Sequence, residues 1–563
     1  MKKFSELPYS RPDVPALLAR MDEQCGLARQ AASGEALVAA FDEVDRLMSE
    51  YSTAGSVCYV RYTIDTRDEF YAAENDFFDE NNPVVSDKVL EFSRIVLASP
   101  HKAALAAKYG GILLEKLEMN VQCASPEILP LMQEENALVS AYQKLYASAQ
   151  VEFDGQVLPL PKLGPYKQST DRAVRKAAYE AEGRFFDEHQ AEFDELYDKL
   201  IQNRNAQAQK LGYENYVPLS YLRMQRLGYG PKEVQAYRDQ VARDVVPVIA
   251  KMKERQAARC GLADPKFYDS TLYFADGNPV PTGTPEEILA AGRRMYHELS
   301  PETAEFIDFM MDHDLLDVLS KPGKAPGGYC TSFAAYQAPF IFSNFNGTSG
   351  DVDVLTHEAG HAFQAYRAFK QQLPGDLQGP GLESCEIHSM SMEFLTSPWH
   401  HLFFGPQTGK YALYHAEDAL SFLPYGCIVD EFQHIMYSQP GLTPAQRNQV
   451  WLDLEKKYRP WIDFGDTPFY SRGAGWQRQL HIYQYAFYYI DYCLAQTVAL
   501  QFFAAFLKDP QDAWQRYLAL VDKAGTATYA GLVQAAGFVV PFEDGSLKPV
   551  ADAIAQWTAD HQL

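Results

Sequence analysis

Apolar residues recur at helical spacing through the first third of this chain, and this periodicity constrains the fold more than any other feature of the sequence. Repeats near i, i+3, i+4 and i+7 are typical of amphipathic helices that bury one face. They predict helices over residues 15–32, 34–51, 65–81, 84–99 and 126–148. We therefore expect a mainly α-helical protein that begins with an antiparallel helical domain.

The helical pattern is interrupted at residues 151–165, where β-branched, glycine and proline residues are typical of a small hairpin or linker. We place a domain boundary there, between an N-terminal helical domain, residues 1–165, and a second domain, residues 166–563. The second domain opens with Ser169-Thr170-Asp171, a candidate N-cap. We expect one long helix or a helix pair from this cap to the residue before Gly212.

The composition of the 563-residue chain is that of a globular protein, with 47% hydrophobic and 22% charged residues. Its net charge of −24 would repel a phosphate backbone, so we expect no nucleic-acid partner. No apolar run approaches the roughly 20 residues that span a bilayer, and the start lacks a secretion signal, so we expect no membrane association. The eight cysteines form no CxxC pair, and reduced thiols in the cytoplasm fit them best.

Glycine and proline residues bracket two short runs, 329–336 and 340–345, which have the character of β-strands. Pro339 lies between them and cannot donate a hydrogen bond to a ladder, so at least one strand is expected at a sheet edge. An edge strand can hold an extended peptide through backbone hydrogen bonds, which makes Tyr336 a candidate substrate contact. An ordinary structural edge strand explains the pattern equally well.

The run His357-Glu358-Ala359-Gly360-His361 lies in a segment, 353–369, whose apolar positions predict a helix. Residues four apart share one helical face, so the two imidazoles can hold one tetrahedral Zn²⁺ while Glu358 reaches a metal-activated water. Such a run arises by chance in roughly one chain in fifty of this composition. Gly360 costs a helix about 1 kcal/mol relative to alanine, and close approach of another group would explain it.

A catalytic zinc needs a third protein ligand. Gln364 and Arg367 occupy the positions where the extended metzincin motif has glycine and histidine, so a downstream carboxylate must be sought. Segment 381–395 offers one, because helical phase brings three glutamates near one face. Phase alone does not choose among Glu383, Glu386 and Glu393, and His388 is a fourth candidate.

These residues carry a family resemblance. His357-Glu-Ala-Gly-His-Ala362, then Glu386 after 24 intervening residues and Glu393 seven further on, resembles the zinc oligopeptidase family of thimet oligopeptidase and oligoendopeptidase F. The similarity is closest to the Pz-peptidase branch and extends over roughly residues 169–540.

The resemblance implies a metal site and a fold. It implies that His357, His361 and Glu386 bind one Zn²⁺ per chain, that Glu358 is the general base, and that Glu393 orients a ligand imidazole. It also implies an ellipsoidal zincin-type fold with a deep substrate channel and a small β-sheet next to the HExxH helix.

A second group of candidates lies in residues 477–492, where histidine and tyrosine recur at helical spacing. Such an aromatic stripe more often packs in a core than performs chemistry. The family resemblance implies instead that His481 with Tyr489 or Tyr492 stabilises the oxyanion of the reaction. It further implies substrate contacts, for which the candidates are Tyr485, Tyr488 and the loop glycines Gly473 and Gly475.

The sequence therefore predicts a zinc-dependent endopeptidase, with residues 166–563 as its catalytic domain. It would hydrolyse internal bonds of short, unstructured peptides by metal-activated water with Glu358 as general base. One alternative is a gluzincin-type aminopeptidase, although no GxMEN-like stretch precedes His357. The other is a non-catalytic helical peptide-binding protein, against which the intact ligand and base residues argue. The sequence leaves the oligomeric state open.

Overall fold

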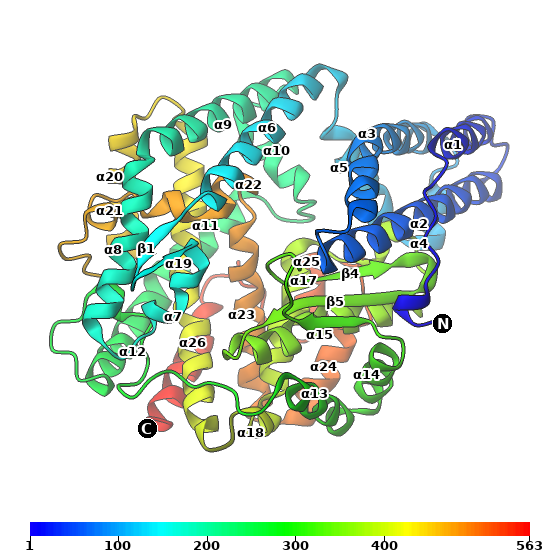
Figure 1. The fold of residues 1–563 in the computed structure, drawn as a ribbon. Coiled ribbons are helices and arrows are strands. Elements are labelled where there is room, and N and C mark those ends of the chain that lie inside the picture. Colours follow the sequence, from blue (N-terminus) through cyan, green and yellow to red (C-terminus); the bar gives the residue numbers. More distant parts are fainter. The chain divides into compact units, whose positions relative to one another are not determined.

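The computed structural model describes all residues 1–563 and divides them into two compact units, each built from segments that are far apart in sequence. Unit 1 comprises Met1–Ala124, Val280–Thr408 and Ala505–Phe538. Unit 2 comprises Ser125–Pro279, Gly409–Ala504 and Val539–Leu563. Helices dominate both units, as Figure 1 shows, which confirms the mainly α-helical prediction. The contiguous domain division at residue 165 stays a prediction.

The N-terminal part of unit 1 contains five helices: α1 (Val14–Arg29), α2 (Gly34–Ile64), α3 (Glu69–Ala98), α4 (Ala103–Tyr109) and α5 (Gly111–Gln122). The prediction of two helices over residues 65–81 and 84–99 is wrong, because α3 continues through Pro83. A proline inside a helix removes one backbone hydrogen bond. Packing of α3 against α1, α2 and α5 buries Phe78, Val85 and Phe92 and offsets that loss.

Unit 1 also contains a three-stranded sheet of β3 (Leu316–Leu319), β4 (Tyr329–Phe333) and β5 (Ala338–Phe345), in the order β3-β5-β4. β4 pairs antiparallel with β5, so β4 is an edge strand, as predicted. Pro339 is tolerated in the central strand because pairing with β3 begins only at Ile341. Tyr336 lies beyond the end of β4, in a 3-10 turn, so the strand is shorter than predicted.

The remaining helices of unit 1 surround this sheet and the segment that carries the HExxH run. They are α13 (Pro285–Leu299), α14 (Pro301–Asp312), α15 (Gly350–Phe369), α16 (Gly375–Gln378), α17 (Leu382–Leu395), α18 (His401–Phe404), α24 (Pro510–Val521) and α25 (Tyr529–Ala535). Helix α15 packs against β5 and against α17 (Figure 1). The small sheet therefore lies next to the HExxH helix, as predicted.

Unit 2 contains the predicted hairpin, formed by the antiparallel strands β1 (Val151–Phe153) and β2 (Gln156–Leu158). Asp154 and Gly155 at its turn both have positive φ angles, of 52° and 72°, as a tight two-residue hairpin turn requires. The long helical segment that follows is a pair, α8 (Arg172–Glu188) and α9 (Gln190–Lys210). Asp171 caps α8 by accepting a hydrogen bond from the Ala173 amide at 2.8 Å, which confirms the predicted N-cap.

The other helices of unit 2 are α6 (Leu129–Ala147), α7 (Gly164–Lys167), α10 (Tyr216–Arg223), α11 (Pro231–Gln240), α12 (Val246–Arg259), α19 (Thr408–Ser438), α20 (Pro444–Tyr458), α21 (Pro468–Ser471), α22 (Leu480–Gln484), α23 (Tyr489–Phe506) and α26 (Leu547–Asp560). Helix α23 extends by two residues into the last segment of unit 1. No helix in either unit is both long enough and apolar enough to cross a membrane.

Candidate metal centre

Helix α15 presents two histidines to the same side. Asp351 in its first turn accepts hydrogen bonds from the backbone amides of Asn346 and Gly347, at 2.8 and 2.7 Å, and so fixes the turn from β5 into the helix. His357 and His361 follow one turn apart, with ring centroids separated by 5.0 Å. The helical prediction for residues 353–369 is thus confirmed, and the two imidazoles face a common point.

Gly360 brings α17 unusually close to α15. A Cβ atom at this position would lie 2.5 Å from the carbonyl oxygen of His388 and 2.6 Å from the Cα atom of Ser389. Both are backbone atoms, which cannot move aside as a flexible side chain could. The close approach that the glycine suggested is confirmed, and it sets the distance between the HExxH helix and the helix that carries the three glutamates.

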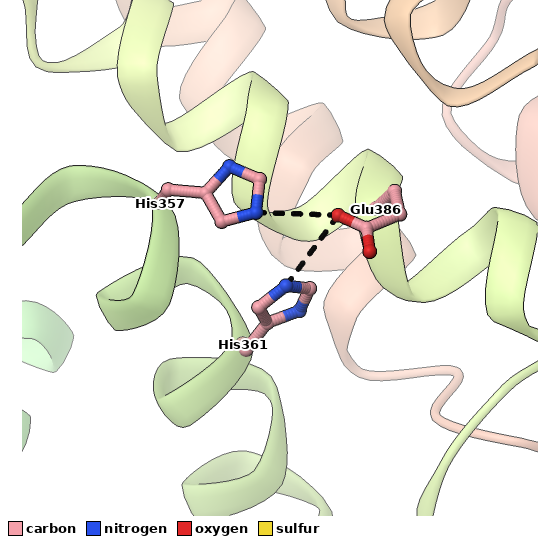
Figure 2. Close-up of side chains that lie close together, drawn as sticks. All are labelled: His357, His361 and Glu386. Carbon is pink, nitrogen blue, oxygen red and sulfur yellow. Dashed lines mark ion pairs between the residues drawn. The ribbon is translucent and has the colours of Figure 1, made fainter. Parts of the chain in front are cut away.

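Glu386 is the glutamate that this contact brings to the histidine pair (Figure 2). Its Oε2 atom lies 3.3 Å from Nε2 of His357 and 3.5 Å from Nε2 of His361. Two ligand atoms about 2.0–2.1 Å from a tetrahedral zinc are separated by about 3.3–3.4 Å. Both distances from Glu386 therefore match such a metal, and all three ligand atoms lie within 4.8 Å of one another. The set of two imidazoles and one carboxylate suits zinc.

A second glutamate of α17 contacts the opposite edge of the His357 ring. Oε1 of Glu393 lies 2.7 Å from Nδ1 of His357. This contact places the proton on Nδ1 and leaves the lone pair of Nε2 directed at the metal position. Burial opposes ionisation of Glu386, but its contacts with the two imidazoles hold the pKa of its carboxyl well below the usual range.

Glu358 lies between the two histidines in sequence and outside the three-residue cluster. Its side chain is half-buried, and burial raises the pKa of its carboxyl, although His357 and His361 partly oppose the shift. A carboxylate with a raised pKa accepts a proton more readily, which is the property that a general base needs.

The two other candidates on α17 do not join the cluster. Glu383 is buried, and its carboxylate lies against Gly381, where a Cβ atom would be only 2.6 Å away. His388 is also buried, which lowers the pKa of its imidazole to about 3. Its carbonyl oxygen accepts a hydrogen bond of 2.8 Å from the Tyr517 hydroxyl of α24, so this residue helps to hold α17 in place.

The histidine and tyrosine candidates lie in unit 2, around a break between two helices. The prediction of continuous helical spacing over 477–492 is wrong, because α22 ends at Gln484 and Phe487 has a φ angle of +69°. The Phe487 amide donates instead to Oε1 of Gln433, at 3.0 Å, which supports the break.

The break still gathers the four predicted tyrosines around one imidazole. The ring centroids of these tyrosines lie 4.9–6.4 Å from that of His481. The four are Tyr485, Tyr488, Tyr489 and Tyr492.

Comparison with known proteins identifies the family. A model of the peptidase M3 N-terminal domain matches residues 4–124, and a model of peptidase family M3 matches residues 302–547. No curated protein gives a significant match. Among solved structures, that of Pz peptidase A with an inhibitor is 46% identical, with 99% of both chains aligned and a TM-score of 0.93. The chain belongs to peptidase family M3.

Two further structures of proteins assigned as oligoendopeptidase F agree with this membership. One is 46% identical with 99% of both chains aligned and a TM-score of 0.93. The other, from Bacillus anthracis strain Ames, is 41% identical with 100% of both chains aligned and a TM-score of 0.88. The predicted resemblance to the Pz-peptidase branch and to oligoendopeptidase F is confirmed. This M3 peptidase is therefore a metalloendopeptidase whose substrates are peptides.

The remaining predicted substrate contacts of the M3 peptidase differ in their surroundings. Tyr336 is half-buried in its turn. Gly473 is buried with a φ angle of +82°, and a Cβ atom there would lie 2.2 Å from the backbone oxygen of Asn448 in α20. That glycine is thus required for packing. Gly475 lies at the wall of a partly open cavity of unit 2.

The sequence analysis missed two residues that control His481 in this M3 peptidase. The Tyr425 hydroxyl donates to Oε1 of Gln479 at 2.8 Å, and Nε2 of Gln479 lies 2.9 Å from Nδ1 of His481. The amide therefore donates to Nδ1 and leaves the imidazole proton on Nε2. Burial lowers the pKa of His481 to about 4, so the ring is a neutral N–H donor near pH 7. Gln479 belongs to no motif, and its proximity in sequence to His481 was the only available signal.

Proposed function

We propose that this M3 peptidase is a zinc-dependent endopeptidase that hydrolyses internal bonds of short, unstructured peptides. The observation that carries the proposal is the spacing of three donor atoms, Nε2 of His357, Nε2 of His361 and Oε2 of Glu386. Three protein ligands leave one tetrahedral position open, as catalytic zinc sites do. A zinc ion bound there would polarise the scissile carbonyl and lower the pKa of the attacking water.

The protein's own residues would move the proton. Glu358, with its raised pKa, would accept the proton of the attacking water and pass it to the leaving amine. Glu393 would keep the proton of His357 on Nδ1, so that Nε2 remains free for the metal. No covalent intermediate with the protein is needed.

His481, with Tyr489 or Tyr492, would donate to the oxyanion that forms on the substrate carbonyl. The Nε2–H group of His481 is suited to this task because the ring is neutral and its tautomer is set by Gln479. Tyr485 is 56% exposed and is free to contact a peptide, and we extend the same role to Tyr488 and Tyr336.

We also propose a cytoplasmic location. All eight cysteines are free thiols, and four of them are buried. A chain whose eight cysteines are all free thiols is typical of a reducing compartment.

The test uses internally quenched peptides whose N-terminus is acetylated, so that an aminopeptidase cannot act. We expect internal cleavage, loss of activity with a chelator, recovery with Zn²⁺, and one zinc per chain by elemental analysis. Cleavage that requires a free N-terminus would contradict the endopeptidase proposal. Full activity in protein shown to be free of metal would contradict the metal assignment.

A further inference from the structure

A cavity of about 190 Å³ lies inside unit 2, and none of its walls belongs to the metal centre. Aromatic and hydroxyl-bearing side chains form most of the lining. Its charged groups are Arg459, Glu455 and Arg478. The volume is somewhat larger than the roughly 150 Å³ of an engineered cavity that binds benzene, so it can hold the end of one residue but not a whole peptide.

One charge in this cavity, that of Arg478, forms no close ion pair. Arg459 forms a two-point ion pair with Glu455, at 2.5 and 2.8 Å. Glu182, the next carboxylate, is paired with Lys167 at 2.6 Å and also accepts a hydrogen bond from Tyr470. No carboxylate lies within 4 Å of the Arg478 guanidinium. The cavity and its surroundings therefore carry one surplus positive charge.

The surroundings of Arg478 are those of a binding group. Its side chain is half-buried, and its strongest electrostatic neighbours are the tyrosines at positions 470, 425 and 179, with Glu182 among them. A charge removed from water normally has a partner, because desolvation is costly. The planar guanidinium offers a fork of N–H donors that matches a carboxylate with two parallel hydrogen bonds. An anion of this shape would neutralise the surplus charge.

The cavity adjoins the candidate oxyanion donors within the same unit. Tyr425 forms part of its wall, and the Tyr425 ring centroid lies 5.8 Å from that of Tyr489. The Tyr425 hydroxyl also bonds Gln479, the residue that orients His481. An extended peptide advances about 3.5 Å per residue. A group in the cavity would thus be a few residues from a bond held by these donors.

We propose that this cavity binds a carboxylate of the peptide substrate, which Arg478 holds through two hydrogen bonds. The proposal rests on the proposed peptidase function, since it places the carboxylate near the bond that is cleaved. The carboxylate belongs to either the C-terminus of the peptide or an Asp or Glu side chain.

The experiment compares matched peptides that differ only in this charge. One pair has the same sequence with a C-terminal carboxylate or a C-terminal amide, and the other has Glu or Gln near the cleaved bond. We expect kcat/KM of the wild-type enzyme to be roughly 10- to 100-fold higher for the acid member of at least one pair, the range for hydrogen bonds to a charged group. The pair that responds identifies the source of the carboxylate.

Variants then assign the effect to the cavity. Arg478→Gln should abolish the preference, so that kcat/KM for the acid peptide falls to that for its neutral partner. Arg478→Lys, which keeps the charge but loses the fork, should show an intermediate preference. Arg243→Gln is the matched control, because Arg243 is an exposed arginine of the same unit, and it should keep the full preference.

Several outcomes would overturn the proposal. They are equal cleavage of both members of both pairs by the wild type, a preference that survives in Arg478→Gln, and an equal loss on acid and neutral peptides in both Arg478 variants, which would mean a structural role. These outcomes are separate from failure of the peptidase proposal, because each is measured on protein that still cleaves peptides. Calorimetric titration of the acid and neutral peptides into Glu358→Gln provides a binding readout that needs no turnover.

Discussion

His357 contacts two glutamates at once, and each ring nitrogen has its own. Nε2 faces Glu386 at 3.3 Å and Nδ1 faces Glu393 at 2.7 Å. The same helix α17 thus supplies both a candidate metal ligand and the group that sets the ligand's tautomer. The two carboxylates therefore have different roles at the centre, and substitution of one should not reproduce substitution of the other.

Replacing the candidate base and the candidate ligand should give different losses. Glu358→Gln keeps the three donor atoms, so we expect full zinc content and a fall in kcat of roughly 10²- to 10⁴-fold, the usual contribution of general acid–base catalysis. Glu386→Ala removes a donor, so zinc and activity should both be lost. Elemental analysis beside peptide kinetics checks this. A zinc-replete but inactive Glu386→Ala protein would contradict the ligand assignment.

Gln479→Glu should change the pH dependence of catalysis. A carboxylate at this position accepts the Nδ1 proton of His481 and raises the imidazole pKa, so only the protonated ring can then donate from Nε2. Wild-type His481, with a pKa of about 4, donates as a neutral group throughout pH 5–8. We expect kcat of the variant to fall as pH rises through the new histidine pKa.

The matched control for this profile is Gln484→Glu. It introduces the same charge at the end of the same short helix, but Gln484 is bonded to Gln143 and not to His481. Its profile should follow the wild type. An unchanged profile in Gln479→Glu would show that the amide does not control the tautomer.

Individual site residues could be predicted from the sequence where the pattern involves neighbours along one helix. The shared face of His357 and His361 follows from helix geometry alone. The choice of Glu386 among three glutamates in similar phase depends on how α17 lies against α15, and only the family resemblance pointed to it. Gln479 acts through a contact formed after the helix break at Phe487, which periodicity did not predict.

At the scale of elements, the contact between α15 and α17 positions the centre. Gly360 allows the backbone of one helix to touch that of the other, and Tyr517 of α24 bonds the same carbonyl of His388. The sequence indicated that something approaches Gly360. It did not indicate which element does so, because that depends on tertiary packing.

Gly360→Ala should therefore weaken metal binding, although it improves the helix propensity of α15. Alanine favours a helix by about 1 kcal/mol over glycine, but the added Cβ would push α17 outward and move Glu386 away from the histidines. We expect the zinc affinity to fall by roughly tenfold or more. Mutation of residues that orient metal ligands causes losses of this size. Competition with a chromogenic chelator measures it.

Gly111→Ala is the control for this substitution. Gly111 lies at the start of α5, and no atom is within 4 Å of the position of an added Cβ. This variant should bind zinc as the wild type does. Unchanged zinc affinity in Gly360→Ala would mean that the helix contact does not set the ligand geometry.

At the scale of the molecule, the half-buried His434 in α19 should limit stability in acid. Burial and the nearby charges of Arg238 and Arg226 lower the pKa of His434 to about 4, although the carboxylate of Asp430 opposes the shift. The unfolded chain binds this proton near pH 6.5 and the native chain does not. Below pH 6.5 the free energy of unfolding should therefore fall, by about 1.4 kcal/mol per pH unit until pH 4.

His434→Phe tests this expectation, because a phenyl ring preserves the packing against Phe487. Denaturant unfolding of zinc-loaded protein from pH 7 to pH 4 should show a shallower decline in the variant. The exposed His401→Gln should leave the slope as in the wild type. An identical slope in His434→Phe and wild type would contradict the assignment.

The discontinuous units have a consequence for how the enzyme is made. The hydroxyl that secures the α17 carbonyl comes from Tyr517, in a segment that leaves the ribosome long after the HExxH helix. Domains generally fold as whole units during synthesis. The nascent chain therefore cannot complete this support of its metal centre until the segment with Tyr517 has been translated. Until then, a chain that is still being synthesised lacks the hydroxyl that holds α17, and we expect it to have no peptidase activity.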